Sequence, residues 1–270
     1  MRQPRGLQGT HETLKWHLFC DDLFFCVHVF TGESIEVSTA WVYDGGVREI
    51  FRHENTLQQS AADYLDISSR TLQIVDVDGG VSIVCRDDSG EVAFSMELKE
   101  RNVFAWKDPA DPDNEGVIHW PDMSGTATYK GKTYSGHGYC KRVMWAESPR
   151  YWGYRFLQST KPDGSLALWG ADGVFGFSKY DYFRLVRPDG TLLSADPEMS
   201  SHKQNTFYAK AGDTNYRIAF EELGYWETRL VSKSMDSMLR QQYGRMTLFA
   251  NEKEVTSGPA FREYCYGTLG

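Results

Sequence analysis

The sequence predicts an all-β protein, arranged as two tandem β-barrels or sheets with one or two short helices. Three observations predict this. Turn-forming segments recur at short intervals, the runs between them are short and rich in β-branched and aromatic residues, and no long amphipathic helices alternate with those runs. Turns spaced about 8–12 residues apart are typical of sandwiches and barrels, whereas a doubly wound α/β fold needs a helix after each strand.

The turn signals combine Gly with Asp or Pro, for example at residues 43–46 (YDGG), 76–80 (DVDGG), 161–164 (KPDG) and 187–190 (RPDG). Gly supplies the positive φ and Pro the fixed φ that tight turns require. Strands are expected between them, including 34–43, 71–77, 81–86, 92–98, 154–159, 165–169, 182–186 and 216–220. The segments 56–64 and 234–243 contain good helix formers and are the expected short helices, with Ser234 as a cap.

The length of 270 residues allows one large domain or two smaller ones. Residues 125–145 and 258–267 share a pattern of glycines and aromatic residues, so each is expected to be the closing strand of its own half. We therefore expect a first domain over 1–145 and a second over 146–270. Residues 146–151 (AESPRY) are the expected connection.

The formal net charge of −8 and the pI near 5.4 indicate a surface that repels nucleic acid and anionic membranes. No apolar run is long enough for a transmembrane helix, so membrane insertion is not expected. The five cysteines are scattered without a CxxC pair, which favours buried thiols in a reducing compartment. Residues 1–17 lack the apolar core of a signal peptide, and we expect a cytoplasmic protein.

The strand expected over 137–145 carries the first candidate site. Because side chains alternate along a strand, His137, Tyr139, Lys141, Val143 and Trp145 share one face. Groups that exchange protons stand there beside an aromatic platform. This is an acid/base site for an apolar substrate if the face lines a cavity. The alternative is an exposed polar face that covers a buried cysteine and methionine face.

The chain ending offers a second candidate, since Phe261, Glu263 and Cys265 share one face of a strand. Burial would raise the pKa of such a carboxyl group and let Glu263 act as a general acid. The alternative is an ion pair with a basic residue on a neighbouring strand.

Aromatic side chains are frequent, at 14% of the residues, and they form either core or pocket lining. Trp152, Tyr154 and Phe156 share one strand face. The candidate substrate-binding residues are Trp145, Trp152, Tyr154, Trp169 and Tyr264.

Sequence motifs for other chemistries are absent. The seven histidines show neither HxH nor HExxH spacing, so no metal site is expected. There is no GxSxG elbow, no Walker loop and no GxGxxG motif at the start of a helix, so no cofactor is expected either.

Three stretches together resemble a known family, the carotenoid 1,2-hydratase-like, double-lipocalin (calycin-like) superfamily. They are residues 70–101, residues 125–145 with Gly-His-Gly-Tyr at 136–139 before a Trp, and the ending Phe-Arg-Glu-Tyr at 261–264 before Gly267. The superfamily includes carotenoid and kievitone hydratases and lipocalin-like pericyclases of natural-product pathways. The resemblance covers most of the chain. It implies two consecutive lipocalin-like barrels with a hydrophobic cavity, and cofactor-free chemistry that hydrates an alkene or steers a cyclisation.

The resemblance places the site at His137, Tyr139, Trp145, Glu263 and Tyr264. The family often has an acidic or amide-bearing stretch after the Gly-x-Gly-Tyr, where this chain has CKRVM at 140–144, so the identity of the proton donor stays open. The apolar run typical of carotenoid hydratases is also missing after the first Trp. The chain therefore favours a compact polyketide, terpenoid or alkaloid over a long polyene.

Two main functions follow, both with an apolar small molecule as partner. The first is a cofactor-independent hydratase, isomerase or cyclase. In it Glu263 or His137 exchanges the proton, Tyr139 and Lys141 donate hydrogen bonds to a developing oxyanion, and Trp145, Trp152 and Trp169 stack on the substrate. The second is a non-catalytic lipocalin-like carrier of a hydrophobic molecule. A protein-interaction module with a filled interior is a third possibility. The substrate, the reaction and the oligomeric state are left open by the sequence.

Overall fold

The computed structural model describes residues 11–31, 35–59, 67–100, 106–108, 115–145, 152–161, 165–175, 178–187, 189–195, 199–231 and 235–269. Every regular element in these ranges is a β-strand, which confirms the all-β class. The chain divides into two compact units, residues 1–148 and 149–270. The expected connection over 146–151 lies entirely outside the described ranges. Among the described residues, no helix is long and apolar enough to cross a membrane.

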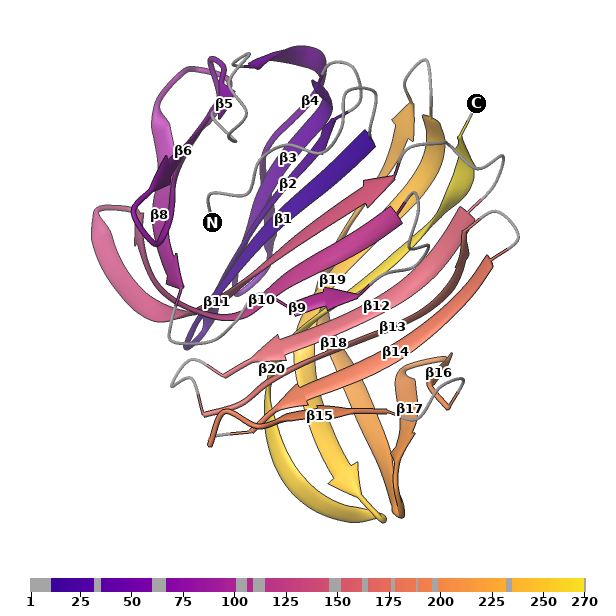
Figure 1. The fold of residues 1–270 in the computed structure, drawn as a ribbon. Coiled ribbons are helices and arrows are strands. Elements are labelled where there is room, and N and C mark those ends of the chain that lie inside the picture. Colours follow the sequence, from indigo (N-terminus) through magenta and orange to yellow (C-terminus); the bar gives the residue numbers. More distant parts are fainter. Residues whose placement is uncertain are drawn as a thin grey trace. The chain divides into compact units, whose positions relative to one another are not determined.

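The first unit contains eleven of the strands, coloured indigo to pink in Figure 1. They are β1 (His11–Cys20), β2 (Leu23–Thr31), β3 (Ile35–Asp44), β4 (Val47–Gln59), β5 (Ile67–Ser68), β6 (Leu72–Val77), β7 (Gly80–Arg86), β8 (Val92–Glu100), β9 (Trp106–Asp108), β10 (Glu115–Tyr129) and β11 (Lys132–Trp145).

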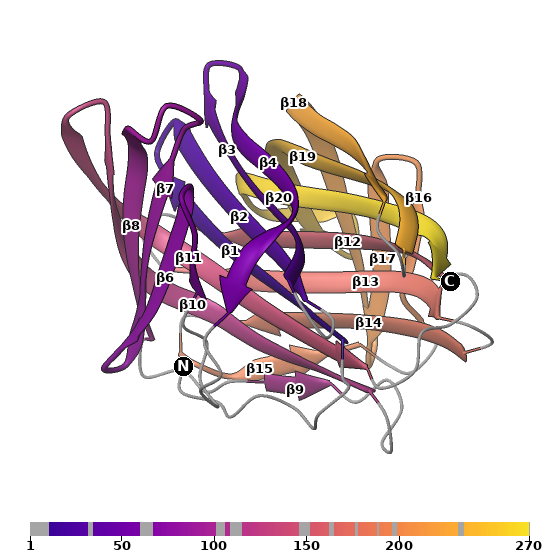
Figure 2. The ribbon, with the colours of Figure 1, turned by 90° about the horizontal axis from the view of Figure 1, so that it is seen from above.

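These strands form a sheet that closes on itself. The order is β11-β1-β2-β3-β4-β5-β6-β7-β8-β10-β9, and β11 also pairs with β10, so all strands but β9 make a ring. Figure 2 shows the ring from above. The pairing is antiparallel throughout. Closure removes the unpaired edges that an open sheet exposes.

Alternation along β1 sorts its side chains between the two faces of the ring. Leu14, Trp16 and Leu18 belong to the apolar core cluster inside the ring, together with Cys140 from β11. The interior of the first unit is therefore lined by apolar side chains. Successive side chains point to opposite faces of a strand, so Lys15, His17 and Phe19 face outward.

One glycine of β11 marks a close approach of two strands. A Cβ atom placed on Gly136 would lie 1.9 Å from the carbonyl oxygen of Phe19 and 2.9 Å from the sulfur of Cys20. Backbone cannot yield as a flexible side chain can, so only glycine fits at this position.

The second unit contains nine strands. They are β12 (Trp152–Thr160), β13 (Ala167–Phe175), β14 (Ser178–Val186), β15 (Leu192–Ser194), β16 (Ser201–Lys203), β17 (Thr206–Ala211), β18 (Thr214–Val231), β19 (Met235–Ala250) and β20 (Lys253–Leu269).

These strands form an open sheet in the order β15-β14-β13-β12-β20-β19-β18-β17-β16. The sheet curls far enough for its edge strand β16 to meet β13, where the backbone N–H of His202 donates to a carboxylate oxygen of Asp172 at 2.8 Å. The concave face holds a second apolar cluster, which includes Leu157, Leu185 and Ala260. We call this side the inner face of the second unit and the opposite side its outer face.

The expected helices are wrong wherever the structure describes them. Residues 56–59 belong to β4 and residues 60–64 lie outside the described ranges. Residues 235–243 belong to β19, which pairs with β18 on one side and β20 on the other, while Ser234 is not described. Leu239, Gln241 and Tyr243 share one face of β19 and are all buried. Pairing on both sides outweighs a helix preference of a few tenths of a kcal/mol per residue.

Candidate functional site

Four ionisable residues form a row across the outer face of the first unit. In the strand register Lys15 pairs with His28 on β2 and with Lys141 on β11, and Lys141 pairs in turn with His119 on β10. All four are buried, and Lys15 and His119 have no exposed surface. Basic groups that are removed from water in this way are costly to hold unless they are paired.

The neighbouring row is built around Tyr139, which is fully buried. Its hydroxyl lies 2.6 Å from Nδ1 of His119. On the other side the ring of His17 stacks on Tyr139 with centroids 5.9 Å apart and planes 23° apart. The phenol is thus held by two imidazoles from β1 and β10, and this hydrogen bond fixes the orientation of its hydroxyl.

His137 lies at the end of the same face and pairs with an acidic residue. Its Nδ1 is 2.7 Å from Oδ1 of Asp122, and the two side chains are 15% and 9% exposed. Asp122 belongs to the irregular stretch of β10 between Trp120 and Met123, where the register with β11 shifts. The carboxylate orients the imidazole in the way that an acid/base histidine requires.

The structure therefore brings His137, Tyr139 and Lys141 together on one face of β11, but it places them outside the ring. The interior side of that strand is occupied by Cys140, which packs in the core cluster. Trp145 is the last residue of β11 and pairs with His11 and Glu115. The side chain of Trp145 lies outside the described part.

In the second unit, Glu263 is completely buried near the middle of β20. The hydroxyl of Tyr154 on β12 donates to its Oε1, and Nε2 of Gln241 on β19 donates to its Oε2 at 2.8 Å. Both carboxyl oxygens are thus held by neutral donors from the two strands that flank β20. Such bonds fix the direction of a carboxyl group and its lone pairs.

Trp169 lies on the same outer face as Glu263. It pairs in register with Gln158, which pairs with Phe261, and all three side chains have no exposed surface. The amide of Gln158 donates to Oγ1 of Thr160 at 2.8 Å. Trp169, Gln158 and Phe261 thus form a row that lies two residues along the strands from the row of Glu263, on the same face.

One other predicted residue, Tyr264, does not join Glu263. Tyr264 alternates to the inner face, where its hydroxyl donates to the carbonyl oxygen of Gln204 at 3.2 Å and the guanidinium of Arg262 lies 4.3 Å from its ring centroid. Trp152 begins β12, and its side chain is not described. The alternation along β20 separates Glu263 from Tyr264, because neighbouring side chains point to opposite faces.

Sequence reasoning missed several residues of these clusters. Gln241 lies in a segment expected to be helical, and its alternation with Leu239 and Tyr243 was the signal that could have revealed it. The partners His119 and Asp122 come from β10 and could not be assigned without the register.

The inner face of the second unit holds a further charged cluster that the sequence did not indicate. Arg155 donates from Nε and Nη2 to the two oxygens of Asp172 at 2.8 and 2.5 Å. Nδ1 of His202 lies 3.4 Å from Oδ1 of the same carboxylate. Burial alone would raise the pKa of Asp172, but hydrogen bonds from His202 and Arg155 lower it to about 2. Burial lowers the pKa of His202 to about 4, against the opposing influence of Asp172.

Within the described residues, no group of three or more His, Cys, Asp or Glu side chains has a metal-binding arrangement. The chemistry that these clusters can perform is proton exchange and hydrogen bonding. Glu263 and His137 carry side chains of the acid/base type, and the hydroxyls of Tyr154 and Tyr139 are each held by a hydrogen bond.

No protein-family model matches the chain, and no curated protein matches its sequence. Several solved structures share its fold. A protein from Nitrosomonas europaea provisionally assigned as AttH superposes with a TM-score of 0.62 and 14% identity, over 96% of this chain and 92% of that one. Kievitone hydratase from Nectria haematococca gives a TM-score of 0.65 and 11% identity, over 98% and 91%. CghA with Sch210972 gives 0.60 and 9%, over 97% and 89%.

These likenesses extend over nearly the whole length of each chain, and at such low identity they establish the fold. The resemblance to the double-lipocalin superfamily is thereby confirmed for the fold. The chain has the tandem two-sheet, lipocalin-like architecture shared by kievitone hydratase and CghA.

Proposed function

We propose that this protein is a cofactor-independent hydratase, isomerase or cyclase that acts on an apolar natural-product intermediate, with Glu263 as a proton-exchanging group. The observation that carries the proposal is the environment of Glu263: a carboxyl group with no exposed surface, whose two oxygens accept hydrogen bonds from Tyr154 and Gln241. Buried carboxyl groups whose oxygens are held by hydrogen bonds occur in acid/base sites.

The two donors favour the carboxylate form, because each satisfies one oxygen, whereas removal from water favours the neutral acid. We assign to this carboxyl group the transfer of a proton to and from the substrate. In an isomerisation the carboxylate removes a proton from one carbon and the acid returns it to another. In a hydration the proton goes to one alkene carbon and water supplies hydroxide to the other, releasing a proton to the base. Isomerisation and hydration both leave the net oxidation state of the substrate unchanged, so an electron carrier is not needed.

We propose that Tyr154 adjusts its hydrogen bond to the protonation state of Glu263. Its hydroxyl stabilises the carboxylate and can reorient when the carboxyl is protonated, as the donor and acceptor roles of a phenol permit. Trp169 and Phe261 are fully buried aromatic side chains on the same outer face, and we assign them to contact with the body of a substrate or with a developing carbocation.

The cluster of the first unit supplies a second set of proposed catalytic groups. We assign His137, oriented by Asp122, to proton exchange, and Tyr139 and Lys141 to hydrogen bonds with a carbonyl or oxyanion. We propose Trp145 and Trp152 as substrate contacts. Tyr264 is a proposed contact only for a part of the substrate that reaches the inner face of the second unit, because it lies on the opposite face from Glu263. The fold supports the class of reaction, since kievitone hydratase has the same architecture.

The proposal is tested by deuterium incorporation. An extract of apolar small molecules is incubated in heavy water with the purified protein, and mass spectrometry follows any compound that gains deuterium or the mass of water. The wild type is expected to convert at least one compound. Glu263→Gln keeps the size of the side chain but removes its proton exchange, so we expect a loss of about 100-fold or more.

Glu227→Gln is the matched control, because Glu227 is an exposed carboxylate 3.4 Å from Arg240 in the same unit. It should retain full conversion. Conversion by Glu263→Gln at the wild-type rate would contradict the assignment of Glu263. A compound that binds to the wild type and is recovered unchanged would instead identify a carrier of hydrophobic molecules.

A further inference from the structure

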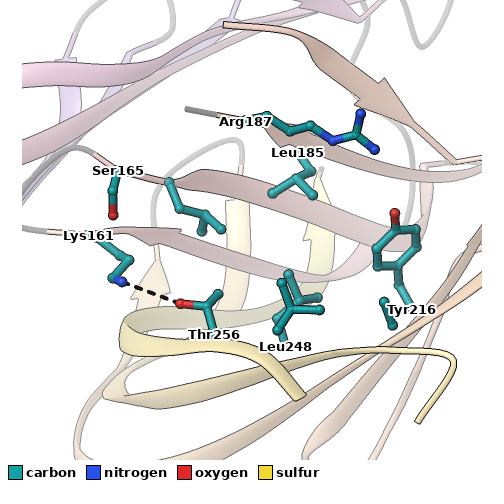
Figure 3. Close-up of a pocket in the computed structure, with 10 residues that line it drawn as sticks. Lys161, Ser165, Leu185, Arg187, Tyr216, Leu248 and Thr256 are labelled. Carbon is teal, nitrogen blue, oxygen red and sulfur yellow. Dashed lines mark hydrogen bonds between the residues drawn. The ribbon is translucent and has the colours of Figure 1, made fainter. Parts of the chain in front are cut away.

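A pocket of about 430 Å³ lies on the inner face of the second unit (Figure 3). Leu185, Tyr216 and Leu248 in its wall belong to the apolar cluster of that face. The pocket is therefore on the side of the sheet opposite to Glu263. Its volume is in the range of about 300–1,000 Å³ that is usual for small-molecule sites.

The wall of the pocket is mainly apolar. Three leucines, an alanine and a valine contribute to it: Leu166, Leu185, Leu248, Ala250 and Val255. Val255 is 56% exposed, which is high for a large apolar side chain and marks the open side. An apolar molecule that enters would cover this surface and remove it from water, which is favourable in proportion to the area buried.

One side of the pocket carries a positioned cation. The aliphatic part of the Lys161 side chain packs over Gly258, since a Cβ atom placed on Gly258 would lie 3.3 Å from Cγ of Lys161. The ammonium group donates to Oγ1 of Thr256 at 3.3 Å. Figure 3 shows Lys161 and Thr256 on the same side of the pocket as Ser165, with Tyr216 on the opposite side.

The charge of the lining has one sign. Lys161 and Arg187 are its ionisable cations, and no aspartate or glutamate is among the described residues that line it. Arg187 is exposed, and its charge also attracts the carboxylate of Asp189, which accepts hydrogen bonds from Thr191. Lys161 is thus the cation with the better defined position in the pocket.

We infer that this pocket binds a small amphipathic monoanion, with its apolar body against the leucines and its anionic group against Lys161 and the hydroxyls of Ser165 and Thr256. The site is separate from the proposed catalytic residues and does not depend on them. An apolar wall with a few convergent polar groups is the usual design of a small-molecule site. A charge-assisted hydrogen bond to the ammonium group selects an anion over a neutral molecule of equal length.

Octanoate and octan-1-ol are the probes, because they have the same chain length and differ in the charge of the head group. Each is titrated calorimetrically into the full-length protein at neutral pH. Octanoate is expected to bind at one site per chain and about tenfold more tightly than octan-1-ol, as one partly exposed charged hydrogen bond allows.

Three variants locate the site. Lys161→Gln should abolish the preference for octanoate and leave octan-1-ol binding unchanged, whereas Ala250→Phe fills the pocket and should abolish both. Lys203→Gln is the matched control, since Lys203 is an exposed cation of the same unit on β16. It should bind both probes as the wild type does. The thermal unfolding midpoint of each variant shows that it is folded.

Glu263→Gln should bind octanoate normally, so failure of this inference and failure of the proposed function give different results. The inference is overturned if neither probe binds to the wild type, if octan-1-ol binds as tightly as octanoate, or if Lys161→Gln keeps the wild-type preference. It is also overturned if Ala250→Phe, shown to be folded, binds octanoate as the wild type does.

Discussion

Replacing His202 should remove much of the pH dependence of stability of the second unit. His202 is 1% exposed, and its Nδ1 faces the carboxylate of Asp172, which Arg155 holds from the other side. Burial lowers the pKa of His202 from 6.5 to about 4. The folded protein therefore keeps this imidazole neutral at a pH where the unfolded chain already protonates it.

The sign of the effect follows from proton uptake. Between about pH 6.5 and 4 the unfolded state binds more protons than the folded state, so the free energy of unfolding falls as the pH falls. The contribution of His202 is fully present above the unfolded pKa and is lost by the folded pKa. A shift of roughly 2.5 units at about 1.4 kcal/mol per unit, evaluated between pH 7 and 4, amounts to about 3 kcal/mol.

The measurement is urea unfolding of the wild type and His202→Gln at pH 7 and pH 4, followed by circular dichroism and tryptophan fluorescence. Glutamine retains a polar group that does not titrate. The loss of stability on acidification should be about 3 kcal/mol smaller in the variant. The difference between the two proteins isolates His202 from the other histidines. Equal losses in the two proteins would refute the reasoning.

Three further predictions concern packing and reactivity. Gly136→Ala should lower the free energy of unfolding by more than about 2 kcal/mol, because its Cβ would meet the backbone of Phe19, whereas Gly46→Ala, with open space around it, should change it by less than about 0.5 kcal/mol in thermal unfolding. Arg262→Leu should cost roughly 2–4 kcal/mol in the same assay, since it removes the donor to Oδ1 of Asn205 and one of the two donors to the carbonyl of Gln204, and a variant as stable as the wild type would contradict this. The five cysteines are all buried, and burial raises the pKa of Cys20 to about 12 and that of Cys85 well above 9.0. None should react with Ellman's reagent in the native protein at neutral pH, and all five should react after unfolding; rapid labelling of a native thiol would count against the described burial.

The architecture was largely predictable because its signals are local. Gly45, Gly79 and Gly190 adopt positive φ angles of 68°, 69° and 81° within turns that the sequence indicated. A residue type that permits such angles is needed wherever a tight turn forms, whatever the rest of the fold. The helix over 234–243 failed for the opposite reason: its strand state depends on β18 and β20, which a local preference does not contain.

The candidate site was only partly predictable. Alternation gave the shared face of His137, Tyr139 and Lys141 and that of Glu263 with Phe261, and these residues do share faces in the structure. It did not indicate that the first group lies outside the ring. Which face becomes the interior depends on the direction in which the whole sheet closes, and a single strand is compatible with either.

By itself the sequence determined the strand class, the turns and the pairs of residues that alternate together, because backbone sterics act over a few neighbouring positions. The tertiary structure alone decided the partners. Tyr154 and Glu263 are 109 positions apart, and Gln241 reaches the same carboxyl from a third strand. Hydrogen bonds of this kind depend on strand order and register, which are set by packing of the complete sheet and are not encoded in any one segment.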